Sequence, residues 1–136
     1  MNNNELIHSA LEAREKSYSP YSGFSVGAAL LCENGKVYTG CNIENSAFSP
    51  TVCAERTAFF KAISEGEKEF VKIAVVGGNS HNDIPENYCP PCGVCRQVMK
   101  EFCTDDFDII MAKSADDYIV MNLNEILPAG FDKREV

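Results

Sequence analysis

The sequence lacks the features that mark exported and membrane-bound proteins. Its first residues, "MNNNELIHSALEAREKS", contain no basic segment followed by an apolar core, and no apolar run approaches the length that spans a bilayer. Low-complexity tracts, internal repeats and long linkers are missing too. We therefore expect a soluble cytoplasmic protein with no membrane partner, in which residues 1–136 form a single domain.

An excess of basic residues is also missing. The chain has 12 Lys and Arg against 20 Asp and Glu, which gives a formal net charge of -8. Proteins that bind polynucleotides depend on Lys and Arg to neutralise phosphates. The acidic balance therefore disfavours nucleic acid as a partner and argues against substrates that carry phosphate.

What the chain does have is cysteine, seven in all. Without an export signal these are expected to be reduced thiols, and an odd number fits that interpretation. Clustered thiols in such a setting are more often metal ligands or catalysts than disulfide partners. The stretch "NYCPPCGVCRQV" places Cys89, Cys92 and Cys95 at even spacing, so this stretch is the first candidate for a metal site.

The spacing of apolar residues predicts an α/β fold in which helices pack on a sheet. The expected order is helix, strand, strand, helix, strand, helix, strand, strand, with a last helical turn in "LNEILPAGF" that Pro128 breaks. Helices are expected over residues 4–17, from near Val52 to just before Gly66, and from near Cys92 onward. Strands are expected over residues 24–30, 36–42, 70–78, 107–112 and 118–122, the first two forming a hairpin.

Two expected helix starts carry cysteine, and this placement favours metal binding. Free amides and the helix dipole at an N-terminus stabilise negative charge and lower the pKa of a thiol. Cys92 and Cys95 lie on one helical turn and can bind one ion, to which Cys53 can add a third ligand. Three protein ligands leave zinc an open position for water, and Glu55 stands two residues from Cys53 to accept a proton from that water.

Other interpretations of these thiols are open at this point. A C-x-x-C pair also occurs in structural zinc knuckles and redox sites, and C-x-x-C-x-x-C resembles part of an iron-sulfur ligand run. Glu55 could be only a favourable acid in a first helical turn. A fourth ligand would close the zinc site and make it structural; the candidates are Cys89, Cys41, Cys103 and His81. The pairing of Cys-Ala-Glu with a later Pro-Cys-x-x-Cys favours catalysis, because it matches the motifs of zinc deaminases with cysteine in place of histidine.

Segments along nearly the whole chain resemble one enzyme family. "YSPYSGFSVGAALL", "GCNIENSAF", "CAERTAFFKAISEG", "PCGVCRQVM" and "ILPAGF" occur in the order and approximate spacing found in the small, homotetrameric cytidine deaminases that bind zinc through three cysteines. The resemblance implies a three-layer α-β-α sandwich around a mixed, mostly five-stranded sheet. It also implies one Zn²⁺ per subunit, active sites shared between the subunits of a homotetramer, and conversion of cytidine and deoxycytidine to uridine and deoxyuridine with release of ammonia, a reaction of pyrimidine salvage.

The resemblance assigns the chemistry of the metal site to particular residues. It implies that zinc is held by Cys53, Cys92 and Cys95. Glu55 then shuttles protons between the bound water, the ring nitrogen and the departing amine. Three thiolates and one zinc carry a formal charge of -1, so a guanidinium at Arg56 could restore Lewis acidity by hydrogen bonding to sulfur. A surface ion pair is the alternative for Arg56, and Gln97 has the same ambiguity between supporting the site and facing solvent.

The resemblance also assigns contacts with the nucleoside. Phe24 corresponds to the aromatic residue that packs on the pyrimidine, and Asn42 and Glu44 correspond to the pair that binds the ribose hydroxyls. Asn42 offers donors and acceptors, whereas Glu44 offers only acceptors. Ala54 would contribute backbone groups near the base, and Phe131 would be the aromatic side chain donated by a neighbouring subunit.

Some positions depart from the family pattern and leave the substrate open. Pro90 stands where relatives often carry a small hydroxyl residue, Phe48 stands where many have tyrosine, and Cys89 has no family role. The residues after Phe131, "DKREV", have no assigned place. Alternatives are a deaminase that acts on a nucleotide, a polynucleotide base or a modified antibiotic nucleoside, and a non-catalytic zinc module closed by Cys89.

Overall fold

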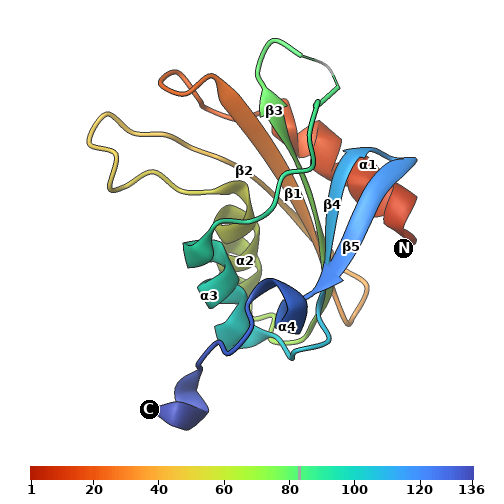
Figure 1. Cartoon of the computed structure of the whole chain (residues 1–136), viewed down its shortest axis with the longest axis vertical. Coiled ribbons are helices and arrows are strands. Elements are labelled where there is room, and N and C mark those ends of the chain that lie inside the picture. Colours follow the sequence, from red (N-terminus) through yellow and green to blue (C-terminus); the bar gives the residue numbers. More distant parts are fainter. Residues whose placement is uncertain (83) are drawn as a thin grey trace.

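The computed structural model describes residues 1–82 and 84–136, which form a five-stranded mixed sheet with the order β2-β1-β3-β4-β5 (Figure 1). The strands are β1 (Phe24–Cys32), β2 (Val37–Cys41), β3 (Phe70–Asn79), β4 (Asp108–Ser114) and β5 (Asp117–Asn122). Strands β3 and β4 are parallel and the other neighbours are antiparallel. The mixed five-stranded sheet predicted through the resemblance is therefore confirmed.

Helices cover both faces of the sheet and make three layers (Figure 1). One face carries α1 (Asn3–Arg14), and the other carries α2 (Ala54–Ser64), α3 (Gly93–Phe102) and the short α4 (Leu123–Ile126). Among the described residues, no helix combines the length and the hydropathy that a membrane span requires. The predicted three-layer α-β-α sandwich is confirmed.

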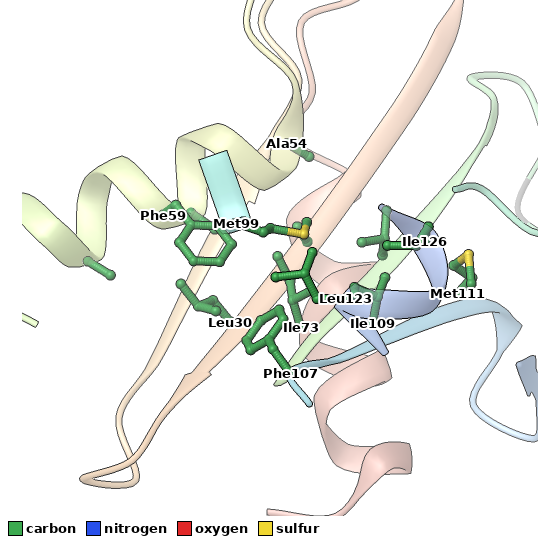
Figure 2. Packing of buried hydrophobic residues seen from close by; sticks show 14 of the residues in the cluster. Leu30, Ala54, Phe59, Ile73, Met99, Phe107, Ile109, Met111, Leu123 and Ile126 are labelled. Carbon is green, nitrogen blue, oxygen red and sulfur yellow. The ribbon is translucent and has the colours of Figure 1, made fainter. Parts of the chain in front are cut away.

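Successive side chains of a strand point to opposite faces of the sheet, so alternate residues of the central strands belong to two separate hydrophobic cores. On the side of α2, α3 and α4, Phe59, Met99 and Leu123 pack against Leu30 and Ile73 (Figure 2). On the opposite side, the packing residues from α1 are Leu6, Ile7 and Ala10, and those from the sheet include Ala29, Val76 and Ile110. Because both faces of β1 and β3 are buried, these two strands form the rigid centre of the sheet on which the helices pack.

The parallel pair of strands places α3 at one end of the sheet. Parallel neighbours need a crossover connection, and α3 lies within the connection from β3 to β4. The N-terminus of α3 therefore comes after the carboxyl end of β3. In open α/β sheets, ligand sites commonly lie beyond the carboxyl ends of strands.

The first turn of α2 lies directly against β2, and Gly40 makes this approach possible. A Cβ atom at Gly40 would lie 2.4 Å from the carbonyl oxygen of Ala54 and 2.6 Å from the amide nitrogen of Ala58. Both neighbours are helix backbone, which cannot move aside as a flexible side chain can. Gly40 thereby fixes where α2 begins, and with it Cys53 and Glu55.

Two predicted helix bounds are wrong, for reasons visible in the backbone hydrogen bonds. The first helix ends at Arg14 instead of residue 17, because the chain must already be extended at Tyr18, which bonds to the backbone on both sides of Ile43. The second helix begins at Ala54 instead of near Val52, because the N–H and C=O of Val52 both pair with Ile43 at 3.0 Å. The other predicted elements occur in the predicted order.

The residues after Phe131, which the sequence left without a place, form an exposed 3-10 turn at Lys133–Glu135. Its first amides are capped by Asp132, whose carboxylate also accepts a bond of 2.7 Å from the Arg134 guanidinium. Hydrogen bonds from Arg134 lower the pKa of Asp132 to about 2. The tail is thus locally ordered, although it lies away from the sheet (Figure 1).

Candidate functional site

Three cysteine sulfurs meet between the N-termini of α2 and α3. The Sγ atoms of Cys53, Cys92 and Cys95 all lie within 4.8 Å of one another. The Cys53 and Cys92 sulfurs are 3.7 Å apart, and those of Cys92 and Cys95 are 3.6 Å apart. Tetrahedral zinc with Zn–S bonds of about 2.3 Å places its sulfurs about 3.8 Å apart. The spacing of the thiols therefore fits a zinc ion without rearrangement.

The two helix starts present these thiols because Cys53 and Cys92 occupy cap positions and Cys95 lies in the first turn of α3. Cys53 is the N-cap residue of α2 and Cys92 that of α3, and neither side chain makes a capping hydrogen bond. Serine or aspartate at such a position would normally bond to the free amides of the first turn. The buried Pro91 precedes Cys92 and suits the entry of α3, since proline has no N–H that would need a partner. The sulfurs thus stay available for a metal.

Within residues 1–82 and 84–136, the thiol cluster has no fourth protein ligand. Cys53, Cys92 and Cys95 make up the whole group of His, Cys, Asp and Glu side chains there that could hold one ion together. The candidates for a closing ligand, which are Cys89, Cys41, Cys103 and His81, are not part of it. Zinc bound here would keep an open coordination position, as catalytic zinc does.

Hydrogen bonds inside the cluster stabilise a thiolate on Cys53. The pKa of Cys53 falls to about 5 because the Cys95 thiol and the Arg56 guanidinium bond to its sulfur. Arg56 Nη2 lies 3.4 Å from Cys53 Sγ, so Arg56 faces the cluster and not a surface acid. Cys95, which holds its proton toward Cys53 and is buried, has a raised pKa. A bound metal ion would displace the thiol protons, and its positive charge would then stabilise the thiolates.

Glu55 is the buried carboxyl group of the site. It lies in the first turn of α2 and is only 3% exposed. Burial, aided by the nearby negative charge of Cys53, raises its pKa to about 7. A carboxyl group with a pKa near neutrality can both accept and return a proton at physiological pH.

A cavity of about 330 Å³ joins the thiols to the predicted nucleoside contacts. Its lining residues are Ser22, Phe24, Val26, Asn42, Glu44, Thr51, Val52, Cys53, Glu55, Cys89, Pro90 and Cys92. The volume is at the lower end of what small-molecule sites occupy. Phe24, Asn42 and Glu44, which lie far from the cysteines in sequence, thus line the same cavity as Glu55.

Asn42 and Glu44 are already held in place by backbone bonds. Asn42 donates to the carbonyl of Phe24 at 2.8 Å and accepts from the amide of Val26 at 2.9 Å, which leaves one N–H and one acceptor position for a ligand. Glu44 accepts bonds from the backbone amides of Tyr21 and Ser22. The Ser22 hydroxyl and these amides lower the pKa of Glu44, so the carboxylate stays ionised. Both side chains therefore have little conformational freedom left to lose if a ligand binds them.

Other predicted site residues lie outside the lining of the cavity. Ala54 is fully buried, and its carbonyl oxygen faces Gly40. Phe131 is 59% exposed, and its carbonyl accepts a bond of 3.0 Å from Gln97 Nε2. The bond from Gln97 thus fastens the C-terminal segment to α3. The roles of Ala54 and Phe131 toward a ligand stay predictions.

The sequence did not point to Ser22 as a site residue. Its hydroxyl donates to Glu44 Oε2 at 2.5 Å and accepts from the amide of Phe24 at 3.0 Å. Ser22 therefore links two of the predicted nucleoside contacts. Its only sequence signal is membership of "YSPYSG", a polar turn, and such turns usually contain serine for local reasons.

Comparisons with known proteins agree with this geometry. The profile described as the cytidine and deoxycytidylate deaminase zinc-binding region matches residues 1–111. The chain is 46% identical over 132 residues to a cytidine deaminase of Sporosarcina psychrophila, covering 97% of this chain and 93% of the relative. It is 44% identical over 136 residues to one of Halalkalibacterium halodurans, covering 100% and 98%. The crystal structure of a cytidine deaminase from Burkholderia pseudomallei superposes with a TM-score of 0.87 at 42% identity, over 96% of this chain and all of that one.

Proposed function

The chain belongs to the cytidine and deoxycytidylate deaminase family, and from this we propose that it hydrolyses cytidine and deoxycytidine to uridine and deoxyuridine with release of ammonia. One observation carries the proposal for this chain: Cys53 and Cys92 of the thiol cluster and the buried Glu55 line one cavity with Phe24, Asn42 and Glu44. We place the reaction in pyrimidine salvage in the cytoplasm, and we take residues 1–136 as one deaminase domain.

The residues of the cavity divide the chemistry between them. Zinc held by Cys53, Cys92 and Cys95 would supply a Lewis acid that lowers the pKa of water. Glu55 takes one proton from the attacking water and delivers it to ring N3 while the hydroxyl adds to C4. Glu55 then takes the proton of that hydroxyl and delivers it to the amine, so the C4–N4 bond breaks, C4 keeps a carbonyl oxygen and ammonia leaves. One carboxyl group suffices because its pKa of about 7 lets it act as base and then as acid.

At the other end of the cavity, Phe24, Asn42 and Glu44 would hold the nucleoside. An aromatic ring stacks on a pyrimidine, and the free acceptor of Glu44 and the remaining donor of Asn42 suit ribose hydroxyls. Glu44 is a carboxylate and the chain carries a net charge of -8, so a phosphate at this end would be repelled. We therefore propose a free nucleoside as substrate, not a nucleotide or polynucleotide.

The direct test is turnover by the purified protein. We expect cytidine to lose its characteristic ultraviolet absorbance while ammonia is released in equal amount, in proportion to the zinc content. A competition assay with cytidine monophosphate should show little inhibition. Zinc-loaded protein that binds cytidine without turning it over would contradict the proposal, and preference for the monophosphate would move it to nucleotides.

Replacing Arg56 by glutamine should slow the reaction without emptying the zinc site. The guanidinium bonds to the Cys53 sulfur at 3.4 Å and offsets the negative charge that three thiolates give the site. Loss of such a partner of a metal ligand typically costs about 10- to 100-fold in activity or metal affinity. We expect kcat to fall by that factor while zinc remains bound, and metal analysis beside steady-state kinetics would show it. Unchanged kcat would return Arg56 to a purely structural role.

We also propose a homotetramer with shared active sites. The segment between β2 and α2 extends away from the sheet and carries Phe48, which is 69% exposed (Figure 1). Phe48 makes an edge contact with Tyr21, itself exposed beside the cavity. Phe131 is exposed in the C-terminal segment, so it is free to reach a neighbouring subunit. Light scattering should report about four times the mass of one chain, and a monomer at full activity would contradict shared sites.

A further inference from the structure

Gly77 of strand β3 lies directly against three residues that line the cavity. A Cβ atom at Gly77 would lie 2.7 Å from Cys89 Sγ, 3.0 Å from Val26 Cγ2 and 3.1 Å from Phe24 Cε2. All three of these neighbours line the 330 Å³ cavity, whereas Gly77 does not. The backbone at Gly77 has no positive φ, so the constraint on this position is steric and not conformational.

The neighbouring glycine points the other way. Gly77 shares its face of β3 with Ile73 and Val75, which pack toward α2 and α3. Gly78 shares the opposite face with Ala74 and Val76, under α1, and a Cβ atom there would meet Pro85 at 3.1 Å. The two positions therefore differ in which side of the sheet a methyl group would enter.

If the space at Gly77 is filled, the backbones that carry the thiol and the ring cannot shift easily, so the two side chains themselves must move. Cys89 follows Tyr88, whose hydroxyl donates to Asp117 at 2.5 Å and whose ring lies 4.6 Å from the Lys113 ammonium. These contacts tie the loop before α3 to the β4–β5 hairpin. The backbone of Phe24 is fixed by bonds to Ser22 and Asn42, so the movable part of Phe24 is its ring.

We infer that Gly77 is a positioning residue: its missing side chain lets the Cys89 thiol and the Phe24 ring rest against β3 and so sets the width of the cavity where the pyrimidine would bind. The inference rests on the proposed function, since it assigns the pyrimidine to this end of the cavity. It also gives Cys89 a role. Cys89 is a neutral wall of the cavity near Glu55, and its volume is matched to a glycine behind it.

Gly77→Ala should therefore weaken nucleoside binding and leave the metal in place. The added methyl group would crowd the wall of the cavity, and overpacking typically costs enough free energy to change a binding equilibrium about tenfold. We therefore expect the KM for cytidine to rise about tenfold. The zinc content should match the wild type, and kcat should stay within about threefold, because Glu55 and the thiols are not displaced. Gly78→Ala is the matched control, with the same added methyl group on the opposite face and a KM close to the wild type.

A second-site change separates this role from general damage to the fold. Cys89→Ala removes the sulfur that the new methyl group would meet at 2.7 Å, so the Gly77→Ala/Cys89→Ala double variant should recover most of the lost affinity. If Gly77→Ala alone does not fold, recovery of soluble, zinc-loaded enzyme in the double variant tests the same contact. A wild-type KM in Gly77→Ala, or a double variant no better than the single one, would overturn the inference. Absence of cytidine turnover in the wild type would instead refute the proposed function.

Discussion

Glu55→Ala should abolish deamination of cytidine while the protein keeps its zinc. General acid–base catalysis by a positioned side chain contributes up to about 10⁴-fold, and in the proposed mechanism this carboxyl group serves several proton transfers in turn, so we expect kcat to fall by at least about 10³-fold. Zinc should remain because the ligands that we propose for it are Cys53, Cys92 and Cys95, whose sulfurs lie within 4.8 Å of one another without a contribution from the Glu55 side chain. Turnover beside metal analysis of the same sample would measure both.

A matched variant removes only the ability to exchange a proton. Glu55→Gln keeps the shape of a side chain that is 3% exposed, but an amide neither gains nor loses a proton at neutral pH. It should be as inactive as Glu55→Ala and fold at least as well. Equal loss of activity in the two variants would exclude the space left by truncation to alanine as the cause. A Glu55→Ala variant with appreciable activity would contradict the mechanism in which Glu55 transfers the protons.

Cys92→Ser should lose zinc and activity together, whereas Cys89→Ser should keep both. A serine hydroxyl is not ionised at neutral pH and is a poor substitute for a thiolate. Residues that only hydrogen-bond to a metal ligand cost up to about 100-fold in metal affinity when they are replaced. Loss of one of the three ligands themselves should therefore weaken zinc binding by more than about 100-fold. Cys92 Sγ lies 3.7 Å from Cys53 and 3.6 Å from Cys95. Cys89 is three residues away in sequence but stands outside the thiol cluster.

The pair is an internal control, because both variants make the same substitution in the same short stretch. Zinc content after purification with a weak chelator, followed by a cytidine assay, should separate them cleanly. If Cys89→Ser also lost its metal, Cys89 would be a fourth ligand, the site would be closed, and the protein would be a zinc module without catalysis.

Most of the fold and the meeting of the three thiols could be predicted from the sequence. Strand β3 could be predicted as a nearly continuous apolar run because both of its faces are buried, and the first helix could be predicted because α1 presents Leu6, Ile7 and Ala10 to the sheet. The cysteines could be placed at helix starts because Pro91 and the apolar positions that follow marked where α3 begins. The nucleoside contacts came only through the family resemblance, since Phe24, Asn42 and Glu44 have no distinctive spacing.

What the sequence could not show depends on contacts between distant segments. Ser22 joins Glu44 to Phe24 only because the turn before β1 folds beside the end of β2. Arg14 continues the charged face of a predicted helix, yet it is buried and donates to the carbonyls of Ser25, Asn79 and Asn82. These bonds join the start of β1 to the end of β3 and the loop that follows it. A pattern of single residues contains no record of such partners.

The distance in sequence between Cys53 and Cys92, which is 39 residues, has a thermodynamic consequence. An unfolded chain does not hold these thiols together, so zinc should bind the folded state far better than the unfolded one. Mass action then makes the free energy of unfolding a function of the free zinc concentration. Above the dissociation constant, each tenfold rise in free zinc adds about 1.4 kcal/mol. The melting temperature of this protein would thus act as a gauge of how much zinc its surroundings supply.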